Sequence, residues 1–127
     1  MRVALDTNRL TDLFQGDSGL AKQLELCDEV CIPLFVLGEI KARFYGGAQR
    51  PRNEILLEKL LAKPTVRVLM PRRQTAEYYG RIFVQLKQAG TPVPHNDLWI
   101  AALVLEHDLT LITRDRHFQR IPQLLRA

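Results

Sequence analysis

The stretch N-D-L-W-I-A-A-L-V-L-E-H-D-L-T-L-I-T, residues 96–113, indicates the fold class. Leu98 to Leu105 is apolar on nearly every side of a helix, which predicts a helix that is largely buried. Leu109 to Thr113 is a short apolar run of strand length and predicts a buried strand. A buried helix that leads directly into a strand is typical of α/β proteins.

The same alternation continues toward the N-terminus. Strands are predicted at residues 2–5, 29–33, 66–70 and 109–113, and helices at 8–15, 18–26, 34–44, 51–62, 74–88 and 98–105. Strands joined by helices imply right-handed crossovers and a parallel sheet. We therefore predict a three-layer α/β/α sandwich around a parallel sheet of four to five strands. The tail from Arg116 to Ala127 allows one helical turn and a very short fifth strand.

Length and composition predict a single globular domain over residues 1–127. The chain is 46% hydrophobic and 25% charged, which excludes collagen-like, disordered and disulfide-scaffold proteins. Its 18 Lys and Arg against 14 Asp and Glu give a net charge of +4, so a polyanion is a candidate partner. No stretch approaches the ~20 apolar residues of a membrane span. We expect a cytoplasmic protein without membrane contact, in which Cys27 and Cys31 are reduced core residues.

Four acidic residues stand at strand ends or in the first turns of helices. Asp6 ends the first predicted strand, and Asp115 lies two residues after the last of the four. Glu39 lies in the first two turns of a helix, and Asp97 begins the buried helix. Open parallel sheets bind ligands outside the carboxyl ends of their strands, so we expect the four carboxylates at one edge.

Carboxylates that converge in this way repel one another unless a cation lies among them. Oxygen ligands suit a hard divalent ion such as Mg²⁺ or Mn²⁺. Such an ion polarises a phosphoryl oxygen and lowers the pKa of a bound water, which supports phosphodiester hydrolysis without a side-chain nucleophile.

Each acid also has a purely structural interpretation. Asp6 and Asp97 could cap the helices that follow them. Glu39 could pair with Arg43 four residues later, and Asp115 could form an ion pair in a surface turn. A shared site is favoured because four separate structural accidents would otherwise have to fall at one sheet edge.

Four motifs resemble the PIN domain, and in length and spacing most of all the VapC-type toxins of bacterial and archaeal toxin–antitoxin pairs. They are L-D-T-N at 5–8, G-E-I at 38–40, N-D-L-W-I-A-A at 96–102 and T-R-D-R-H-F at 113–118. They occur in family order and span nearly the whole chain. The resemblance implies a Mg²⁺- or Mn²⁺-dependent endoribonuclease, in which the acidic cluster consists of Asp6, Glu39, Asp97 and Asp115.

The resemblance also implies partners. Members of the family form homodimers or higher toxin–antitoxin oligomers, and a small antitoxin covers the active site with its C-terminal segment. The RNA target would be chosen by shape and exposed single-stranded segments, because no sequence-reading motif is present. One departure from the family is the C-terminus, where residues 124–127 leave little room for the last strand.

Further residues are assigned supporting roles. Four polar residues match family positions that orient the acids or their waters: Thr7, Asn8, Asn96 and Thr113. Four arginines lie within a few residues of the acids and are predicted to contact RNA phosphates, which suit the planar guanidinium: Arg9, Arg43, Arg114 and Arg116. The histidines share no ligand spacing, and His117, near the site, is a candidate phosphate contact.

Two other classes fit the sequence less well. A phospho-receiver domain has a similar length and fold, but it needs an acidic pair after the first strand and a late lysine. Here Thr7 follows Asp6, and no lysine follows Lys87. A catalytically inactive PIN-like module that only binds RNA or protein would be expected to have lost at least one of the four acids, and all are present.

Overall fold

The structure is a computed structural model that describes residues 1–127. Its sheet has five strands in the order β3-β2-β1-β4-β5, and every neighbouring pair is parallel. This confirms the predicted fold class. The strands are β1 (Arg2–Leu5), β2 (Glu29–Pro33), β3 (Val66–Leu69), β4 (Thr110–Ile112) and β5 (Leu125–Arg126).

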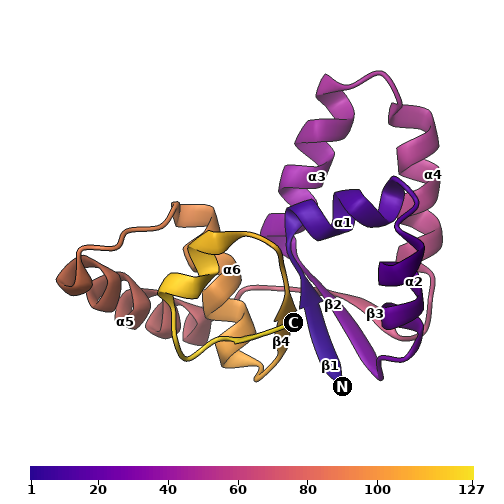
Figure 1. Cartoon of the computed structure of the whole chain (residues 1–127). Coiled ribbons are helices and arrows are strands. Elements are labelled where there is room, and N and C mark those ends of the chain that lie inside the picture. The colour runs from indigo at the N-terminus through magenta and orange to yellow at the C-terminus, as the bar shows by residue number, and fades with distance from the viewer.

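Helices cover both faces of the sheet, as predicted. Figure 1 shows α1, α2 and α4 on one side of the strands and α5 and α6 on the other. A short 3₁₀ helix, η1, precedes β5. The helices are α1 (Thr7–Phe14), α2 (Ser18–Glu25), α3 (Leu34–Gly46), α4 (Arg50–Leu61), α5 (Arg73–Ala89), α6 (His95–Glu106) and η1 (Arg116–Arg120).

The core forms one cluster of 32 buried apolar residues. It includes all but the first residue of β1, and Leu98 together with the run Ile100–Val104 of α6. The all-round apolar character of α6 therefore reflects contacts on nearly every side. Cys27 and Cys31 are buried and form no disulfide.

Most element ends lie within two residues of the predicted ones, and two larger departures concern the start of α6 and the last strand. Helix α6 begins at His95, three residues early, because Pro94 occupies the N-cap and its carbonyl accepts a hydrogen bond from the Leu98 amide at 3.1 Å. The apolar pattern did not indicate this start, because the residues of the first turn are polar. The chain also has room for β5, whose Leu125 pairs with Thr110 of β4, because buried Phe118 anchors the preceding η1 in the core.

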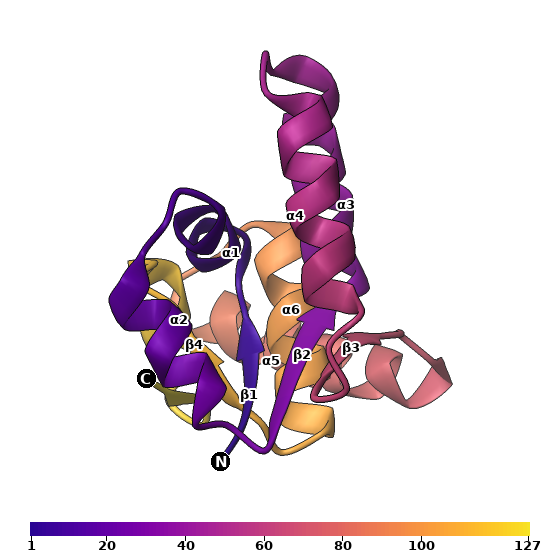
Figure 2. The same ribbon diagram turned by 90° about the vertical axis from the view of Figure 1, so that its right-hand side faces the viewer.

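The topology places the site. Strands β1, β2 and β3 are placed one after another toward one edge of the sheet, whereas β4 lies on the other side of β1. The strand order thus reverses between β1 and β4, where ligands bind in open parallel sheets. The adjacent α3 and α4 run side by side and project well beyond the ends of the strands (Figure 2).

Candidate functional site

A pocket of about 250 Å³ opens at the carboxyl ends of the strands, at this reversal point. It contains all four of the predicted acidic residues, which come from four separate segments of the chain. Its lining also includes three of the four predicted supporting residues, one of the predicted arginines, and His117. The polar lining residues are Asp6, Thr7, Asn8, Glu39, Arg43, Asn96, Asp97, Asp115 and His117.

Asp6 both caps a helix and faces the pocket. Its Oδ1 accepts a hydrogen bond from the Arg9 amide at 2.9 Å, which caps α1, and its Oδ2 accepts one from the Thr113 hydroxyl. Asp6 is buried, with only 4% of the residue exposed, and this burial raises the pKa of Asp6 despite the two hydrogen bonds. The capping interpretation and the site interpretation of Asp6 are therefore compatible.

Asp97 lies in the first turn of α6 and is not its N-cap, so the capping interpretation of this residue is wrong. Its Oδ2 lies 3.2 Å from Nδ1 of His117. Burial is the main cause that raises the pKa of Asp97, and the charge of Asp115 adds to it. A carboxyl group held in this way is costly to ionise unless a cation is supplied.

Glu39 is held by α6 and not by its own helix. The Asn96 side-chain amide donates a hydrogen bond to Glu39 Oε1 at 2.9 Å. The pair with Arg43, which was the alternative interpretation of Glu39, is not formed. The Arg43 guanidinium instead donates to Thr11 Oγ1 at 2.8 Å and to Asn8 Oδ1 at 3.2 Å, which keeps it at the rim of the pocket.

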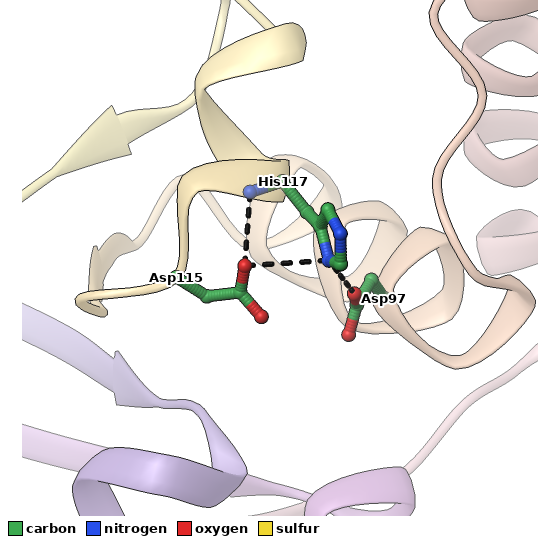
Figure 3. A group of neighbouring side chains, drawn as sticks. All are labelled: Asp97, Asp115 and His117. Atoms are coloured by element: carbon green, nitrogen blue, oxygen red, sulfur yellow. Dashed lines mark hydrogen bonds and ion pairs between the residues drawn. The ribbon is translucent and has the colours of Figure 1, made fainter.

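Asp115 caps η1, since its Oδ1 accepts a hydrogen bond from the His117 amide at 2.9 Å. The His117 ring folds back over the same carboxylate, so that Nδ1 lies 3.3 Å from Asp115 Oδ1 and 3.2 Å from Asp97 (Figure 3). From the sequence, His117 is only a candidate phosphate contact near the site. An Asp-x-His spacing in which the aspartate caps a helical turn is the signal that brings the ring to the carboxylate.

The four predicted RNA-contacting arginines differ in their surroundings. Arg9 is paired with Asp12 at 2.9 Å and with Asp17 at 3.4 Å. Arg114 donates two hydrogen bonds to Asp12, at 2.9 and 3.2 Å, and these lower the pKa of Asp12. Arg116 is exposed, and Arg43 lines the pocket.

The donor atoms fit a divalent cation. One ligand atom each from Asp97, Asp115 and His117 lie within 4.8 Å of one another. Thr7 Oγ1, in the pocket lining, is buried and has no hydrogen-bond partner within the protein. A buried hydroxyl without a partner is costly, and an ordered water or a hydrated ion in the pocket would satisfy it.

The chain matches known proteins along almost its full length. The sequence model of the PIN domain matches residues 3–124. Ribonuclease VapC1 of Haemophilus influenzae (strain R2866) is 34% identical over 130 residues, which cover 98% of this chain and 95% of that protein. The chain belongs to the PIN-domain family, among the VapC-type ribonuclease toxins. The family predicted from the four motifs, and the predicted function as a ribonuclease toxin, are thereby confirmed.

Two solved structures agree with this assignment. The structure of VapBC2 from Rickettsia felis, bound to a DNA fragment from its promoter, superposes on this chain with a TM-score of 0.91 at 25% identity. The match covers 100% of this chain and 98% of the other chain. A toxin–antitoxin complex from Klebsiella pneumoniae gives a TM-score of 0.73 at 26% identity, covering 97% and 95%. None of the helices here has the length and hydropathy needed to cross a membrane.

Proposed function

We propose that this PIN domain, residues 1–127, hydrolyses RNA internally with a divalent ion, Mg²⁺ or Mn²⁺, held by Asp6, Glu39, Asp97 and Asp115. One observation carries the proposal: these four acids, from four separate segments, line a single pocket at the edge where the strand order reverses. The raised pKa values of Asp6 and Asp97 support it, because a cation in the pocket would offset the cost of ionising these buried carboxyl groups.

When bound, the ion would lower the pKa of a coordinated water and polarise the phosphoryl oxygen. The protein supplies position. Thr113 holds Asp6, and Asn96 holds Glu39, so each carboxylate has a fixed direction before RNA arrives. Thr7 and Asn8 complete the polar wall of the pocket.

RNA phosphates are contacted by arginines around the pocket. Arg43 and Arg116 are the stronger candidates, because Arg43 lies in the pocket wall and Arg116 is exposed without an ion pair to a carboxylate. Arg9 and Arg114 share Asp12, so a phosphate would have to compete with that carboxylate for them.

The proposed partners are an RNA substrate, a small antitoxin protein and a second copy of the chain. Relatives support the first two, since one is named a ribonuclease and others were crystallised as toxin–antitoxin complexes. A homodimer or a higher toxin–antitoxin oligomer, and a cytoplasmic location, where RNA substrates occur, stay predictions.

Cleavage of a labelled RNA that contains single-stranded loops tests the proposal. We expect cleavage with Mg²⁺ or Mn²⁺, none with EDTA, and none by the Asp97→Asn variant with either ion. Asp28→Asn is the matched control, because Asp28 is exposed and pairs with the N-terminal amine at 2.6 Å, outside the pocket. Cleavage that continues in EDTA would overturn the proposal, as would full activity of Asp97→Asn.

A further inference from the structure

His117 is presented to the pocket by a rigid turn. It belongs to η1, which Asp115 caps through the His117 amide, and the next residue, Phe118, is 1% exposed in the core. The backbone on both sides of the ring is therefore held in place. The imidazole side chain itself is 40% exposed and reachable from the pocket.

One ring nitrogen faces both carboxylates. In Figure 3, Nδ1 of His117 points between Asp97 and Asp115, at 3.2 Å and 3.3 Å from their oxygens. Two ligand atoms about 2.1 Å from one ion are about 3.0 Å apart at a right angle and about 3.4 Å apart at the tetrahedral angle. The two separations from His117 Nδ1 fall in this range, and all three ligand atoms lie within 4.8 Å of one another, so they can converge on one ion.

We propose that His117 Nδ1 is a direct ligand of the ion held by Asp97 and Asp115, and that it gives the site a preference for transition-metal ions over Mg²⁺. This inference rests on the proposed function, because it concerns the same ion. Imidazole nitrogen suits first-row transition metals, whereas Mg²⁺ is bound mainly by oxygen ligands and water. One nitrogen among carboxylates therefore favours Mn²⁺, Fe²⁺, Co²⁺ or Zn²⁺ without excluding Mg²⁺.

The alternative is that the His117 ring serves only as a hydrogen-bond donor between two carboxylates. In that case an ion would bind to oxygen atoms alone, and replacement of the ring would affect Mg²⁺ and Mn²⁺ equally. The two arrangements differ in whether a nitrogen contacts the ion.

Mn²⁺ is the probe, because its pulsed EPR spectrum reports directly coordinated nitrogen. We expect a ¹⁴N coupling in the Mn²⁺ complex of the full chain, replaced by a ¹⁵N coupling when the protein is labelled with ¹⁵N-histidine. His117→Phe should abolish the coupling and weaken Mn²⁺ binding at least about tenfold, with a smaller change for Mg²⁺. His95→Phe is the matched control and should retain the coupling, because His95 is exposed and bonds to Tyr79.

The outcomes separate this inference from the proposed function. The wild-type chain could bind Mn²⁺ without any nitrogen coupling and lose this binding on Asp97→Asn substitution. That result would overturn the ligand role of His117 and leave the carboxylate site intact. Equal loss of Mg²⁺ and Mn²⁺ affinity in His117→Phe would overturn the selectivity. Binding of Mg²⁺ but not of Mn²⁺ by the wild-type chain would overturn this inference and leave the proposed function intact, whereas failure to bind either ion would overturn both. The ¹⁵N comparison uses wild-type protein and does not depend on the folding of a variant.

Discussion

The hydroxyl of Thr113 donates a hydrogen bond to Asp6 Oδ2, across 107 positions of sequence. The same hydroxyl oxygen accepts a hydrogen bond from the Asp115 amide at 3.0 Å. Thr113 thus links Asp6, which follows β1, to the turn that carries Asp115 after β4. Two of the four acids are positioned relative to each other through this one side chain.

Thr113→Val should disturb this link while it preserves the shape of the side chain. The hydrogen bond from Thr113 lowers the pKa of Asp6, whereas burial raises it, so its loss should raise the pKa of Asp6 further. We expect RNA cleavage to fall about 10- to 100-fold. NMR titration of the Asp6 carboxyl carbon in metal-free protein measures the first effect.

Thr110→Val, in β4 just before Thr113, is the control for Thr113→Val and should leave both the Asp6 pKa and the cleavage rate unchanged. If Thr113 only stabilised the fold, Thr113→Val would lower the stability of the protein without changing the titration of Asp6. An unaltered titration and cleavage rate in Thr113→Val would contradict the linking role.

Asp97→Asn should stabilise the metal-free protein at neutral pH. Because the folded-state pKa of Asp97 is raised, its contribution to stability is fully present below the ordinary carboxyl pKa, about 3.9, and is lost as the pH rises through the raised value. The Tm of Asp97→Asn should therefore exceed that of wild type at pH 7, and the difference should shrink as the pH falls toward 4. Calorimetry with EDTA present measures this.

Addition of Mn²⁺ or Mg²⁺ should then raise the Tm of wild type at pH 7 more than that of Asp97→Asn, since an ion that binds the folded state stabilises it. A lower Tm of the variant in EDTA at neutral pH would show that Asp97 is stabilising in the absence of metal. That result would contradict the burial cost assigned to it.

Arg43→Ala should weaken RNA binding more than Arg9→Ala does. Arg43 lies in the pocket wall, whereas Arg9 is paired with Asp12 and Asp17. Loss of one phosphate contact should reduce the slope of log affinity against log salt by about 1. The binding is measured in an Asp97→Asn background, so that the RNA stays intact. Equal slopes for this parent protein and for its Arg43→Ala and Arg9→Ala derivatives would exclude a phosphate contact by Arg43.

Asn96→Leu should separate catalysis from stability. The Asn96 amide is the hydrogen-bond donor to Glu39 in this structure, and Asn96 is exposed. We expect cleavage to fall roughly tenfold or more, because Glu39 loses its orientation. The free energy of unfolding should change by less than about 1 kcal/mol, as is usual for surface positions. Gln88→Leu, which changes another exposed amide, on α5, is the control.

Much of the fold could be predicted because the apolar pattern and the connections constrain it strongly. The all-round apolar α6 could be buried only between a sheet and other elements. Parallel crossovers then placed the carboxyl ends of the strands, and Asp6 and Asp115 with them, at one edge. Nothing in the apolar pattern, however, predicted that α3 and α4 would project beyond the sheet.

The parts that could not be predicted depend on side-chain rotamers and caps. The position of His117 over two carboxylates follows from the capped turn at Asp115, and helical periodicity does not report such a turn. One of the two ion pairs of Arg9 is with Asp17, which comes from the loop before α2. Proximity in sequence to an acid was therefore a poor guide to which arginines remain available.

The place of β4 beside β1 has a consequence for the chain as it is synthesised. Asp6 emerges early from the ribosome, but Asp97 and Asp115 follow about ninety and about a hundred and ten residues later. Pairing over such separations is slow to form, because a long loop must close first. A nascent chain therefore has no assembled acidic pocket until β4 has emerged and docked, and RNA close to the ribosome meets an inert polypeptide until then.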